Sequence, residues 1–355
     1  MIKFIKLEDA CFVRRGTTIT KKQTKKGNIP VIAGGRKATY FHNKHNRESG
    51  TITISGSGAS AGLVNYWSIP IFASDCSTVE LKDNKQNVKF IYYYLQSMQE
   101  FIYKNMRSGA AQPHVYAKDI ANLNFPLLSL EKQQRIVAKL DAAFAEIDKS
   151  ISLNNKKLEA TTTIRAKILP DLFDRYGSKF ISNPLGSLFK VSSGKFLPKN
   201  KMNSEGNIKV YGGNGIAGNH NVFNLDGKNV LIGRVGAYCG NVHYINEKIW
   251  LTDNAMYTHS YKYDFNPKFL SLILSAINMR SFARHAAQPV ISFSSIKDLK
   301  IRFPESVDEQ SQIVNAFEKI ENNLHKLRIN YKKQKQSFEV LKSSILAQEM
   351  QKGAA

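Results

Sequence analysis

The sequence contains one long internal repeat. Residues 7–16 recur as residues 185–194, an offset of 178 (185 − 7), and this register holds with small drifts through most of the chain. Within it, Gly58 recurs as Gly236 in a glycine-rich stretch of similar spacing. A repeat of this length indicates a duplicated domain and not a solenoid of short units. The chain is therefore expected to contain two similar modules.

Size and charge limit the classes of protein to consider. The 355 residues provide room for two domains of ordinary size, each with its own core. Lys and Arg number 51 against 28 Asp and Glu, a formal net charge of +23. Because such an imbalance repels itself, it usually serves a polyanionic partner. Nucleic acid is the expected partner, since no basic amphipathic helix with aromatic anchors indicates a membrane surface.

Cysteine use and hydropathy indicate the compartment. Cys11, Cys76 and Cys239 show no metal-ligand spacing and cannot all pair, as expected in a reducing cytosol. Acidic residues interrupt the apolar N-terminal segment, which argues against a signal peptide. The longest apolar run, residues 269–277, is too short to span a bilayer. We expect a cytoplasmic protein with no membrane segment and no metal site.

Each copy begins with a section of mixed texture, residues 7–127 and 185–304. These sections are rich in Gly, Asn, Ser and aromatic residues, and short β-type runs alternate with turn signals. Apolar spacing predicts a helix in each section, over residues 88–105 and 267–283. Strands around one or two helices predict a compact mixed α/β domain in each copy.

Each copy then continues into a long helix with a regular apolar stripe. In the first copy the stripe is Val137, Leu140, Phe144, Ile147, Ile151, Asn154 and Leu158. In the second it is Phe317, Ile320, Leu324, Leu327, Tyr331, Gln334, Phe338, Leu341 and Ile345. Steps that alternate between three and four residues over three to four heptads are typical of a coiled-coil seam.

The two stripes are expected to bury each other. Roughly 40 residues of helix extend about 60 Å, which a small domain cannot cover. Duplicated domains favour an antiparallel pair, and the polar residues Asn154 and Gln334 would then fix its register. Ser129 and Ser306 are expected to cap the two helices, and Pro170 is expected to end the first.

These observations predict an α+β fold with internal pseudo-two-fold symmetry. Two similar α/β domains, residues 1–127 and 173–304, are separated by a long antiparallel two-helix coiled coil. The first coil helix falls within residues 128–172 and the second within residues 305–355.

The sequence contains no recognisable catalytic motif. It has no phosphate-binding Gly-x-x-x-x-Gly-Lys-[Ser/Thr] loop, no Asn-Pro-Pro-[Tyr/Phe] tetrapeptide of amino-methyltransferases, no His-Glu-x-x-His and no Cys-x-x-Cys. Glu247 and Lys248 beside Asp253 could suggest a nuclease, but the first copy has Ile69 and Pro70 where the second has Glu247 and Lys248. We therefore predict a binding protein and not an enzyme.

Paired loops with basic residues are the predicted DNA-binding surface. Lysines supply phosphate attraction that is independent of sequence, whereas Arg, Asn, Gln and Ser on loops can contact base edges. The candidate DNA-binding residues are Lys22, Lys25, Arg36, Lys37, Ser57, Arg107, Gln112 and His114 in the first copy and Lys195, Lys199, Asn214, Arg234, Tyr238, Arg284 and Gln288 in the second. For any single glycine loop, a plain turn is an equally good explanation.

The loop tips differ between the copies although their glycine framework matches. Ser57 stands against Val235, and Ser60 stands against Tyr238. Two similar scaffolds that carry different contact residues imply two different half-sites.

The organisation resembles the specificity (S) subunit of a type I restriction–modification system. Two Gly-rich α/β domains alternate with two long helices, and each helix is entered through Phe-Pro and a Gln-x-x-Ile-Val stretch. The matching residues are Phe125, Pro126, Gln133, Ile136 and Val137 in the first copy and Phe303, Pro304, Gln310, Ile313 and Val314 in the second. The resemblance covers nearly the whole chain.

The resemblance implies a non-catalytic DNA-recognition subunit. Each globular part would be a target recognition domain that reads one half of a bipartite sequence in double-stranded DNA. The helices would set the spacing and dock two modification (methyltransferase) subunits. This chain would hold no cofactor, because the partners would bind S-adenosylmethionine and, where restriction subunits are present, ATP.

Three other functions stay open from the sequence. One is a stand-alone bipartite DNA-binding protein such as a regulator. Another is the specificity subunit of a fused type II restriction–modification enzyme. The third is a protein–protein adaptor whose basic charge is incidental.

Overall fold

The computed structural model describes residues 3–109, 111–176, 180–284 and 289–353. The chain forms two compact units, unit 1 (Met1–Lys156 with Tyr331–Ala355) and unit 2 (Lys157–Asn330). The long helices α5 (Leu130–Tyr176) and α9 (Val307–Gly353) each contribute one part to each unit. Because the compact units cut across both helices, the four segment boundaries given by the sequence stay predictions.

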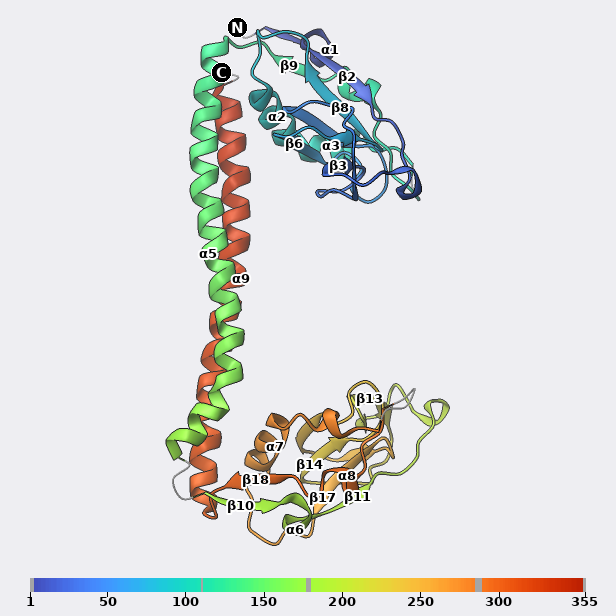
Figure 1. Cartoon of the computed structure of the whole chain (residues 1–355), viewed down its shortest axis with the longest axis vertical. Helices are drawn as coiled ribbons and strands as arrows, with labels where there is room; N and C mark the ends of the chain where they lie inside the picture. Colours follow the sequence, from blue (N-terminus) through green and yellow to red (C-terminus); the bar gives the residue numbers. More distant parts are fainter. Residues whose placement is uncertain (1–2, 110, 177–179, 285–288, 354–355) are drawn as a thin grey trace. The chain divides into compact units, whose positions relative to one another are not determined.

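Unit 1 contains three small sheets (Figure 1). The first, in spatial order, is β2 (Cys11–Arg15), β8 (Cys76–Leu81), β5 (Thr51–Ser55) and β6 (Val64–Trp67), all antiparallel. The second is β4 (Tyr40–His42), β3 (Ile29–Ile32) and β7 (Phe72–Ala73), and the third pairs β1 (Phe4–Lys6) with β9 (Asn124–Pro126). The short helices are α1 (Leu7–Ala10), η1 (Lys21–Gln23), α2 (Val88–Ser97), α3 (Gln99–Asn105) and α4 (Ala117–Ala121).

Unit 2 repeats this topology strand for strand. Its sheets are β11 (Lys190–Ser193), β17 (Ala255–His259), β14 (Lys228–Gly233) and β15 (Val242–Asn246); β13 (Gly215–His220), β12 (Ile208–Gly212) and β16 (Ile249–Leu251); and β10 (Ile181–Pro184) with β18 (Lys300–Phe303). Its helices are α6 (Leu185–Leu188), η3 (Lys199–Lys201), α7 (Pro267–Ala276), η4 (Met279–Phe282) and α8 (Phe293–Ile296). The duplicated α/β fold is therefore confirmed.

In each unit, one helix lies between the four-stranded sheet and the coiled coil. In unit 1, α2 packs its buried Phe90 and Leu95 in one core with Ile52 of β5 and Leu140 of α5. α7 takes the same place in unit 2, where Phe269 shares a core with residues of β14, α5 and α9. Burial of such side chains, worth roughly 1.5–3 kcal/mol each, holds the globular part on the helices.

The predicted helices over 88–105 and 267–283 are each interrupted in the structure. α2 ends at Ser97 and α3 begins at Gln99, and α7 ends at Ala276 before η4. The Gln99 side chain explains the first break, because it accepts from Val64 N (3.0 Å) and donates to Gly62 O (2.7 Å). This tertiary contact turns the backbone at Met98 and has no signature in local periodicity.

The paired helices are antiparallel within each unit, as predicted. In unit 1 Lys139 Nζ pairs with Glu349 (3.3 Å) and Lys342 Nζ pairs with Asp148 (2.8 Å). In unit 2 Arg165 Nε pairs with Glu321 (2.8 Å), and Arg328 Nε donates to Thr161 Oγ1 (2.9 Å). Partner numbers fall on one helix as they rise on the other, which is the antiparallel arrangement. Both helices begin directly after their predicted caps. The Ser129 hydroxyl accepts from Lys132 N, and the Ser306 hydroxyl accepts from Glu309 N.

The predicted seam residues are more completely buried on α5 than on α9. Asn154 is 5% exposed and its Nδ2 donates to Tyr331 O at 2.6 Å, which agrees with a role in register. The same role for Gln334 is wrong, because Gln334 is exposed, and Leu327 and Leu341 are 41% and 45% exposed. On a straight helix, residues seven apart are rotated by roughly 20° relative to each other about the helix axis. The face that contacts α5 therefore moves away from these heptad positions along α9.

The expectation that Pro170 ends the first long helix is wrong. α5 continues to Tyr176, with Pro170 inside it. Proline in a helix costs roughly 3 kcal/mol. Leu172 is 4% exposed in the core of unit 2, and Phe173 stacks on Phe269, so burial of the last turns offsets this cost.

No helix of the described residues is long and apolar enough to cross a membrane.

Two buried cysteines are expected to resist alkylation in the folded protein. Burial raises the pKa of both the Cys11 and the Cys76 thiol to about 12, so the reactive thiolate is scarce at pH 7.5. We expect iodoacetamide at pH 7.5 to modify them only after addition of urea, as measured by peptide mass spectrometry. Rapid modification of either thiol under native conditions would contradict this prediction.

Candidate nucleic-acid interface

Three loops of unit 1 are joined at one end of the four-stranded sheet. We define loop cluster 1 as residues 34–37, residues 55–61, and residues 107–109 with 111–115. Backbone bonds join the last two loops, from Gly58 N to Pro113 O (3.0 Å) and from Val115 N to Gly56 O (3.0 Å). The Ser55 hydroxyl donates to Gly34 O at 3.0 Å and ties in the first loop. The structure thus brings Arg36, Lys37, Ser57, Arg107, Gln112 and His114 into one cluster.

Side chains inside loop cluster 1 are partly committed to its architecture. Arg107 donates from Nε to Ala61 O at 2.7 Å, and its guanidinium lies 4.0 Å from the Tyr103 ring centroid. The Ser57 hydroxyl donates to the Asp75 carboxylate. Arg36, Lys37 and Gln112 are exposed, so these are the side chains free to meet a partner.

Unit 2 has the equivalent arrangement, loop cluster 2, defined as residues 193–199, 212–215, 233–240 and 289–291. Gly236 N donates to Pro289 O (2.9 Å), and Ile291 N donates to Arg234 O (2.8 Å). Arg234 Nη1 donates to the Ser193 hydroxyl at 2.7 Å, which ties in the segment after β11. Of its predicted residues, Lys195, Lys199, Asn214 and Tyr238 are exposed and Arg234 is half-buried.

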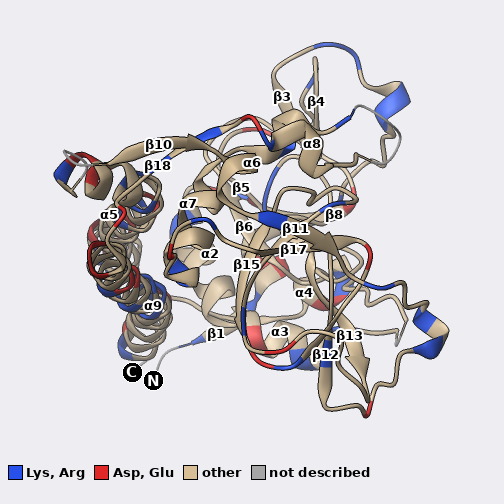
Figure 2. Cartoon of the chain, turned by 90° about the horizontal axis from the view of Figure 1, so that it is seen from below, with Lys and Arg blue, Asp and Glu red and all other residues tan. Residues whose placement is uncertain are grey.

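The remaining predicted residues lie at the margins. Lys22 and Lys25 are exposed on the segment beside β4, where Lys25 N bonds to His42, and not within loop cluster 1. Arg284 is exposed and its N–H donates to Val290 O at 3.0 Å, next to loop cluster 2. Gln288 lies outside the described residues. Figure 2 shows basic turns (blue) beside strands β3 and β4 and beside β12 and β13.

Matched glycines explain why the loop framework recurs. Gly58 and Gly236 have φ of +75° and +96°, a backbone region that L side chains avoid. At Gly16 and Gly194 a Cβ would lie 2.2 Å from Ser74 O and 2.3 Å from Leu251 O, respectively. Gly58, Gly194 and Gly236 restrict the backbone within the clusters, and Gly16 restricts the segment directly after β2. The residues between them are free to differ.

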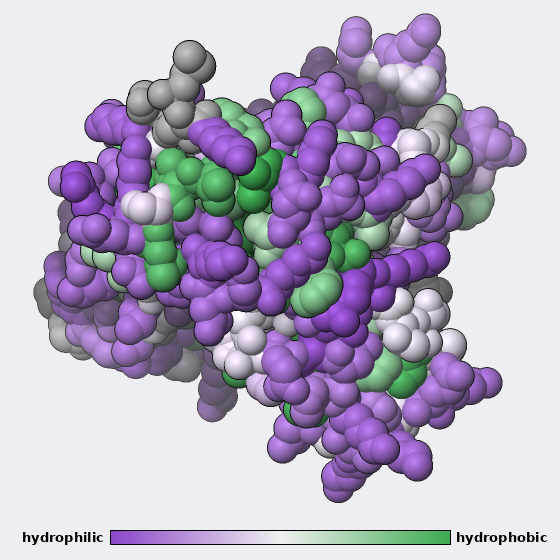
Figure 3. All heavy atoms as spheres, turned by 90° about the horizontal axis from the view of Figure 1, so that it is seen from above, coloured by the Kyte–Doolittle hydropathy of each residue, from purple (hydrophilic) through white to green (hydrophobic). Residues whose placement is uncertain are grey.

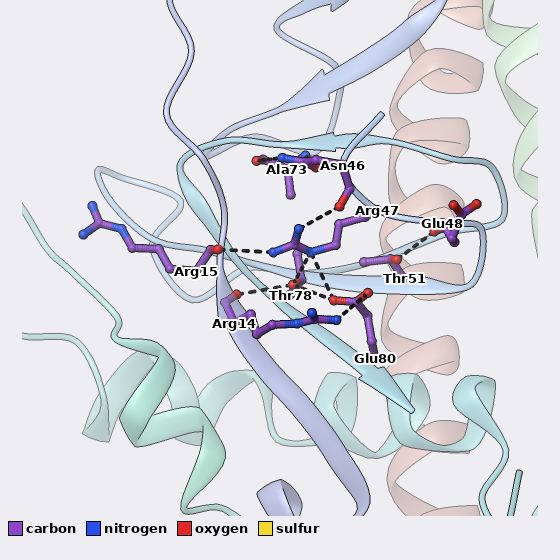
Figure 4. Close-up of polar contacts among 9 residues, drawn as sticks. All are labelled: Arg14, Arg15, Asn46, Arg47, Glu48, Thr51, Ala73, Thr78 and Glu80. Carbon is purple, nitrogen blue, oxygen red and sulfur yellow. Dashed lines mark hydrogen bonds and ion pairs between the residues drawn. The ribbon is translucent and has the colours of Figure 1, made fainter. Parts of the chain in front are cut away.

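The sequence did not predict a hydrogen-bond network around Arg47 in unit 1 (Figure 4). Arg47 donates to Thr78 Oγ1 (2.9 Å), Asn46 O (2.7 Å) and Arg15 O (3.2 Å), and it pairs with Glu80 at 3.1 Å. Figure 4 shows the Arg15 side chain directed away from this network, and the residue is exposed. Arg15 immediately precedes Gly16 of the repeat, which was the available signal in the sequence for an exposed basic side chain at this position.

The basic residues predicted to bind DNA have no ion-pair partner in the described part of the chain. By contrast, Lys89 pairs with Asp141 of α5 and Lys209 pairs with Glu247. Burial lowers the pKa of His243, which lies beside the Gly212–Gly215 hairpin, so its ring adds no charge at neutral pH. The clusters can therefore offer phosphate attraction, base-edge donors and acceptors, and close backbone approach.

A buried glutamine in each unit fixes the globular part to its long helix. Gln133 is 0% exposed; its Oε1 accepts from Asn87 N (2.8 Å), and its Nε2 donates to Leu128 O (2.9 Å) and Gln86 Oε1 (2.6 Å). Asn87 in turn caps α2. The Gln-x-x-Ile-Val stretch is thus a docking element for α2.

Unit 2 has the same device. Gln310 is also 0% exposed, and its Oε1 accepts from Asn266 N at 2.8 Å, where Asn266 caps α7. Its Nε2 donates to Pro304 O (3.0 Å) and Asp264 O (3.2 Å). Both units therefore hold their globular part against the coil through one side chain at a matched position.

A neighbouring polar cluster reinforces this junction in unit 1. Asp141 on α5 accepts from Lys89 Nζ and from the Tyr93 hydroxyl, each at 2.6 Å. Burial alone would raise the pKa of the Asp141 carboxyl, but these two hydrogen bonds outweigh burial and hold it below its usual value. Burial and the adjacent carboxylate raise the pKa of Tyr93.

Comparison with known proteins identifies the family. The family model described as type I restriction modification DNA specificity domain matches residues 2–160 and 179–333. The chain belongs to this family. One matched segment falls on each copy of the repeat, so each copy is similar to the domain that this family model describes.

Individual relatives of these specificity domains are distant. The type I restriction enzyme EcoprrI specificity subunit of Escherichia coli is 26% identical over 255 residues, covering 67% of this chain. The aligned part spans 63% of that relative's length, under two thirds of it.

Two solved structures share the fold at 16% identity and cover 98% of the chain. One comes from a study of complex assembly and conformational transition of the type I R-M system, with a TM-score of 0.74, covering 97% of that chain. The other is the HsdS subunit from Thermoanaerobacter tengcongensis, with a TM-score of 0.59, covering 96% of that chain.

Proposed function

We propose that this chain is the sequence-specific DNA-recognition subunit of a type I restriction–modification complex. Loop cluster 1 reads one half of a bipartite target and loop cluster 2 reads the other. The observation that carries this proposal is the pair of clusters with one backbone framework, unpaired basic residues and different exposed side chains. Two different readers on one frame fit an asymmetric, two-part sequence.

Catalysis belongs to partner subunits in this proposal. The sequence lacks the motifs for methyl transfer and for nucleotide hydrolysis, and its exposed loops supply binding groups. S-adenosylmethionine would be bound by modification subunits, and ATP by restriction subunits where the complex also cleaves DNA. This chain would supply the sequence preference of the whole assembly.

We further propose that α5 and α9 set the spacing and dock two modification subunits. Exposed apolar side chains along these helices support docking: Leu153, Ile164, Leu327, Ile329, Val340 and Leu341 are each at least 40% exposed. Phe4 of β1 and two residues near the start of α5, Leu127 and Leu130, are also exposed. The face of the molecule in Figure 3 is largely hydrophilic with separate apolar patches. Apolar side chains exposed in this number favour a protein partner.

A methylation map tests the function directly. The full chain would be expressed with its neighbouring methyltransferase subunit, and modified adenines would be mapped across the host genome. We expect one split motif with two short specific halves separated by a fixed gap. A single continuous motif, or methylation that does not depend on this chain, would overturn the proposal.

The salt dependence of DNA binding separates the proposal from an adaptor role. Affinity for duplex DNA is expected to fall steeply between 50 and 200 mM salt, by about 10³-fold or more if six or more phosphates are contacted. Affinity that does not change with salt would instead favour a protein–protein adaptor. Tight binding of the chain alone, without methyltransferase, would favour a stand-alone regulator.

Replacing Arg234 with alanine is expected to relax only the half-site read by unit 2. Its Nη1 bonds to Ser193 and to Asp253 O (3.3 Å), and its other guanidinium N–H groups have no partner among the described residues. A base-edge contact from these groups is worth roughly 1–3 kcal/mol. Competition binding with duplexes changed in one half at a time measures this effect.

The matched control is Arg36→Ala, which removes an exposed arginine of loop cluster 1 and should affect the other half-site. Equal loss of affinity by Arg234→Ala for all duplexes would make Arg234 a phosphate contact. Relaxation of the half-site read by unit 1 would contradict the assignment of one half to each unit.

A further inference from the structure

One phenylalanine protrudes from the basic segment that follows β11. Phe196 is 73% exposed, the largest fraction among the exposed large hydrophobic side chains of the described residues. Single exposed hydrophobic residues are common on proteins and need no explanation by themselves. Phe196 differs from such residues in two ways: hydrogen bonds hold the backbone around it, and lysines lie close to it in the sequence.

The backbone on both sides of Phe196 is held in place. Gly194 N donates to Ala255 O (3.1 Å), and Lys195 N donates to Leu251 O (2.9 Å). Trp250 Nε1 donates to Lys195 O at 3.2 Å, directly before the phenylalanine. After it, η3 is closed by a bond from Lys201 N to Pro198 O at 2.9 Å. The ring is therefore presented from an anchored turn.

Lysines lie before and after Phe196 in this segment. Lys195, Lys199 and Lys201 surround it in sequence, all are exposed, and none forms an ion pair with a described residue. Arg234 is bonded to Ser193, three positions before the ring. An apolar ring flanked by unpaired cations matches a ligand whose aromatic faces lie between phosphates, which is the chemistry of a nucleic acid.

Unit 1 lacks this device. Thr18 occupies the equivalent position (196 − 178). The surrounding backbone is the same, because Thr17 N donates to Ala73 O (2.9 Å) as Lys195 N does to Leu251 O. The units therefore share this backbone bond but carry different side chains on it, Thr17 and Thr18 in unit 1 against Lys195 and Phe196 in unit 2.

We propose that Phe196 is a stacking wedge that opens one base step in the half-site bound by unit 2. The ring would insert against a base while the flanking lysines hold the phosphates on either side. Apolar side chains used in this way unstack a base step and kink the duplex. This inference rests on the proposed DNA-recognition function and adds an asymmetry, since the half-site bound by unit 1 would stay stacked at the equivalent step.

The test uses the full chain assembled with its methyltransferase subunits. Duplexes carry 2-aminopurine at successive positions of the half-site that the methylation map assigns to unit 2, and its fluorescence rises when stacking is lost. We expect a rise of several-fold at one step with the unmodified chain. Phe196→Ala should abolish that rise and weaken binding about 5- to 150-fold, the usual range for one lost stack, whereas Phe196→Trp should keep it.

Phe223→Ala is the matched control. Phe223 is another exposed phenylalanine of unit 2 (47%), covered by Lys248 at 4.7 Å from its ring centroid. This variant should retain both the fluorescence rise and the affinity. Circular dichroism and sedimentation of each complex show whether the variants fold and assemble.

The outcomes separate this inference from the proposed function. If the unmodified complex binds its target without a rise at any step, the wedge is wrong and DNA recognition stands. A rise that persists in Phe196→Ala marks a base opened by another subunit and also overturns the wedge. Loss of subunit assembly with unchanged fluorescence would make Phe196 a protein contact. If the unmodified complex shows no sequence-specific binding, the proposed function itself fails.

Discussion

Replacing Gln133 with alanine is expected to lower the free energy of unfolding by about 3 kcal/mol. The change removes three hydrogen bonds and leaves the N–H of Asn87 and the carbonyl of Leu128 without their partner. A buried polar group without a partner costs roughly 1–3 kcal/mol, and the cavity adds to this cost. Urea denaturation followed by circular dichroism measures the loss.

Adjacent exposed glutamines provide controls for this prediction. Gln134 is exposed, so Gln134→Ala should change the stability by less than about 0.5 kcal/mol. Gln310→Ala should destabilise the chain as Gln133→Ala does, with exposed Gln312→Ala as its control. A change below 1 kcal/mol for both buried glutamines would show that apolar packing alone holds α2 and α7 on the coil.

Shortening the coiled coil by one heptad is expected to change the spacing of the target without changing either half. The ion pairs Lys139–Glu349 and Asp148–Lys342 show which residues face each other. The deletion therefore removes residues 147–153 of α5 together with residues 335–341 of α9. Seven residues of helix extend about 10 Å, or roughly three base pairs of DNA.

The readout is the methylation map of cells that express the shortened chain. We expect the two specific halves to be retained and the gap between them to shrink. A deletion of three residues from each helix is the control, because it rotates one face of the pair away from the other and should abolish assembly. Altered half-sites after the heptad deletion would show that the helices take part in reading the sequence.

The repeat and the apolar periodicity predicted the architecture because they follow from backbone rules. Matched glycines mark backbone positions that only glycine can adopt, so the loop framework was visible in the sequence. The coil was visible because apolar residues of α5 and α9 recur at steps of three and four, although the stripe on α9 is buried only in part. The prediction that Pro170 ends the helix was wrong because burial of Leu172 outweighs the local preference of proline against a helix interior. Apolar periodicity gives no measure of that burial.

The side chains that complete the candidate site were less predictable. Arg47 contacts Arg15, which is 32 residues away in sequence, and Thr78, which is 31 residues away. Such contacts depend on strand register, which no local pattern specifies. Gln334 was assigned to the seam by counting heptads, whereas the face that each helix presents depends on how far the pair has drifted from a strict repeat.

The division of the long helices between the units has a consequence for folding during synthesis. Unit 2 is one continuous stretch, Lys157–Asn330, whereas unit 1 needs Tyr331–Ala355 as well as its first part. Leu346 and Met350 of that late segment share a core with Ile136 and Leu140. Domains usually fold in the order in which the ribosome releases them. Here unit 1, whose synthesis starts first, waits for residues that are made after unit 2, so unit 2 is complete on the nascent chain before unit 1.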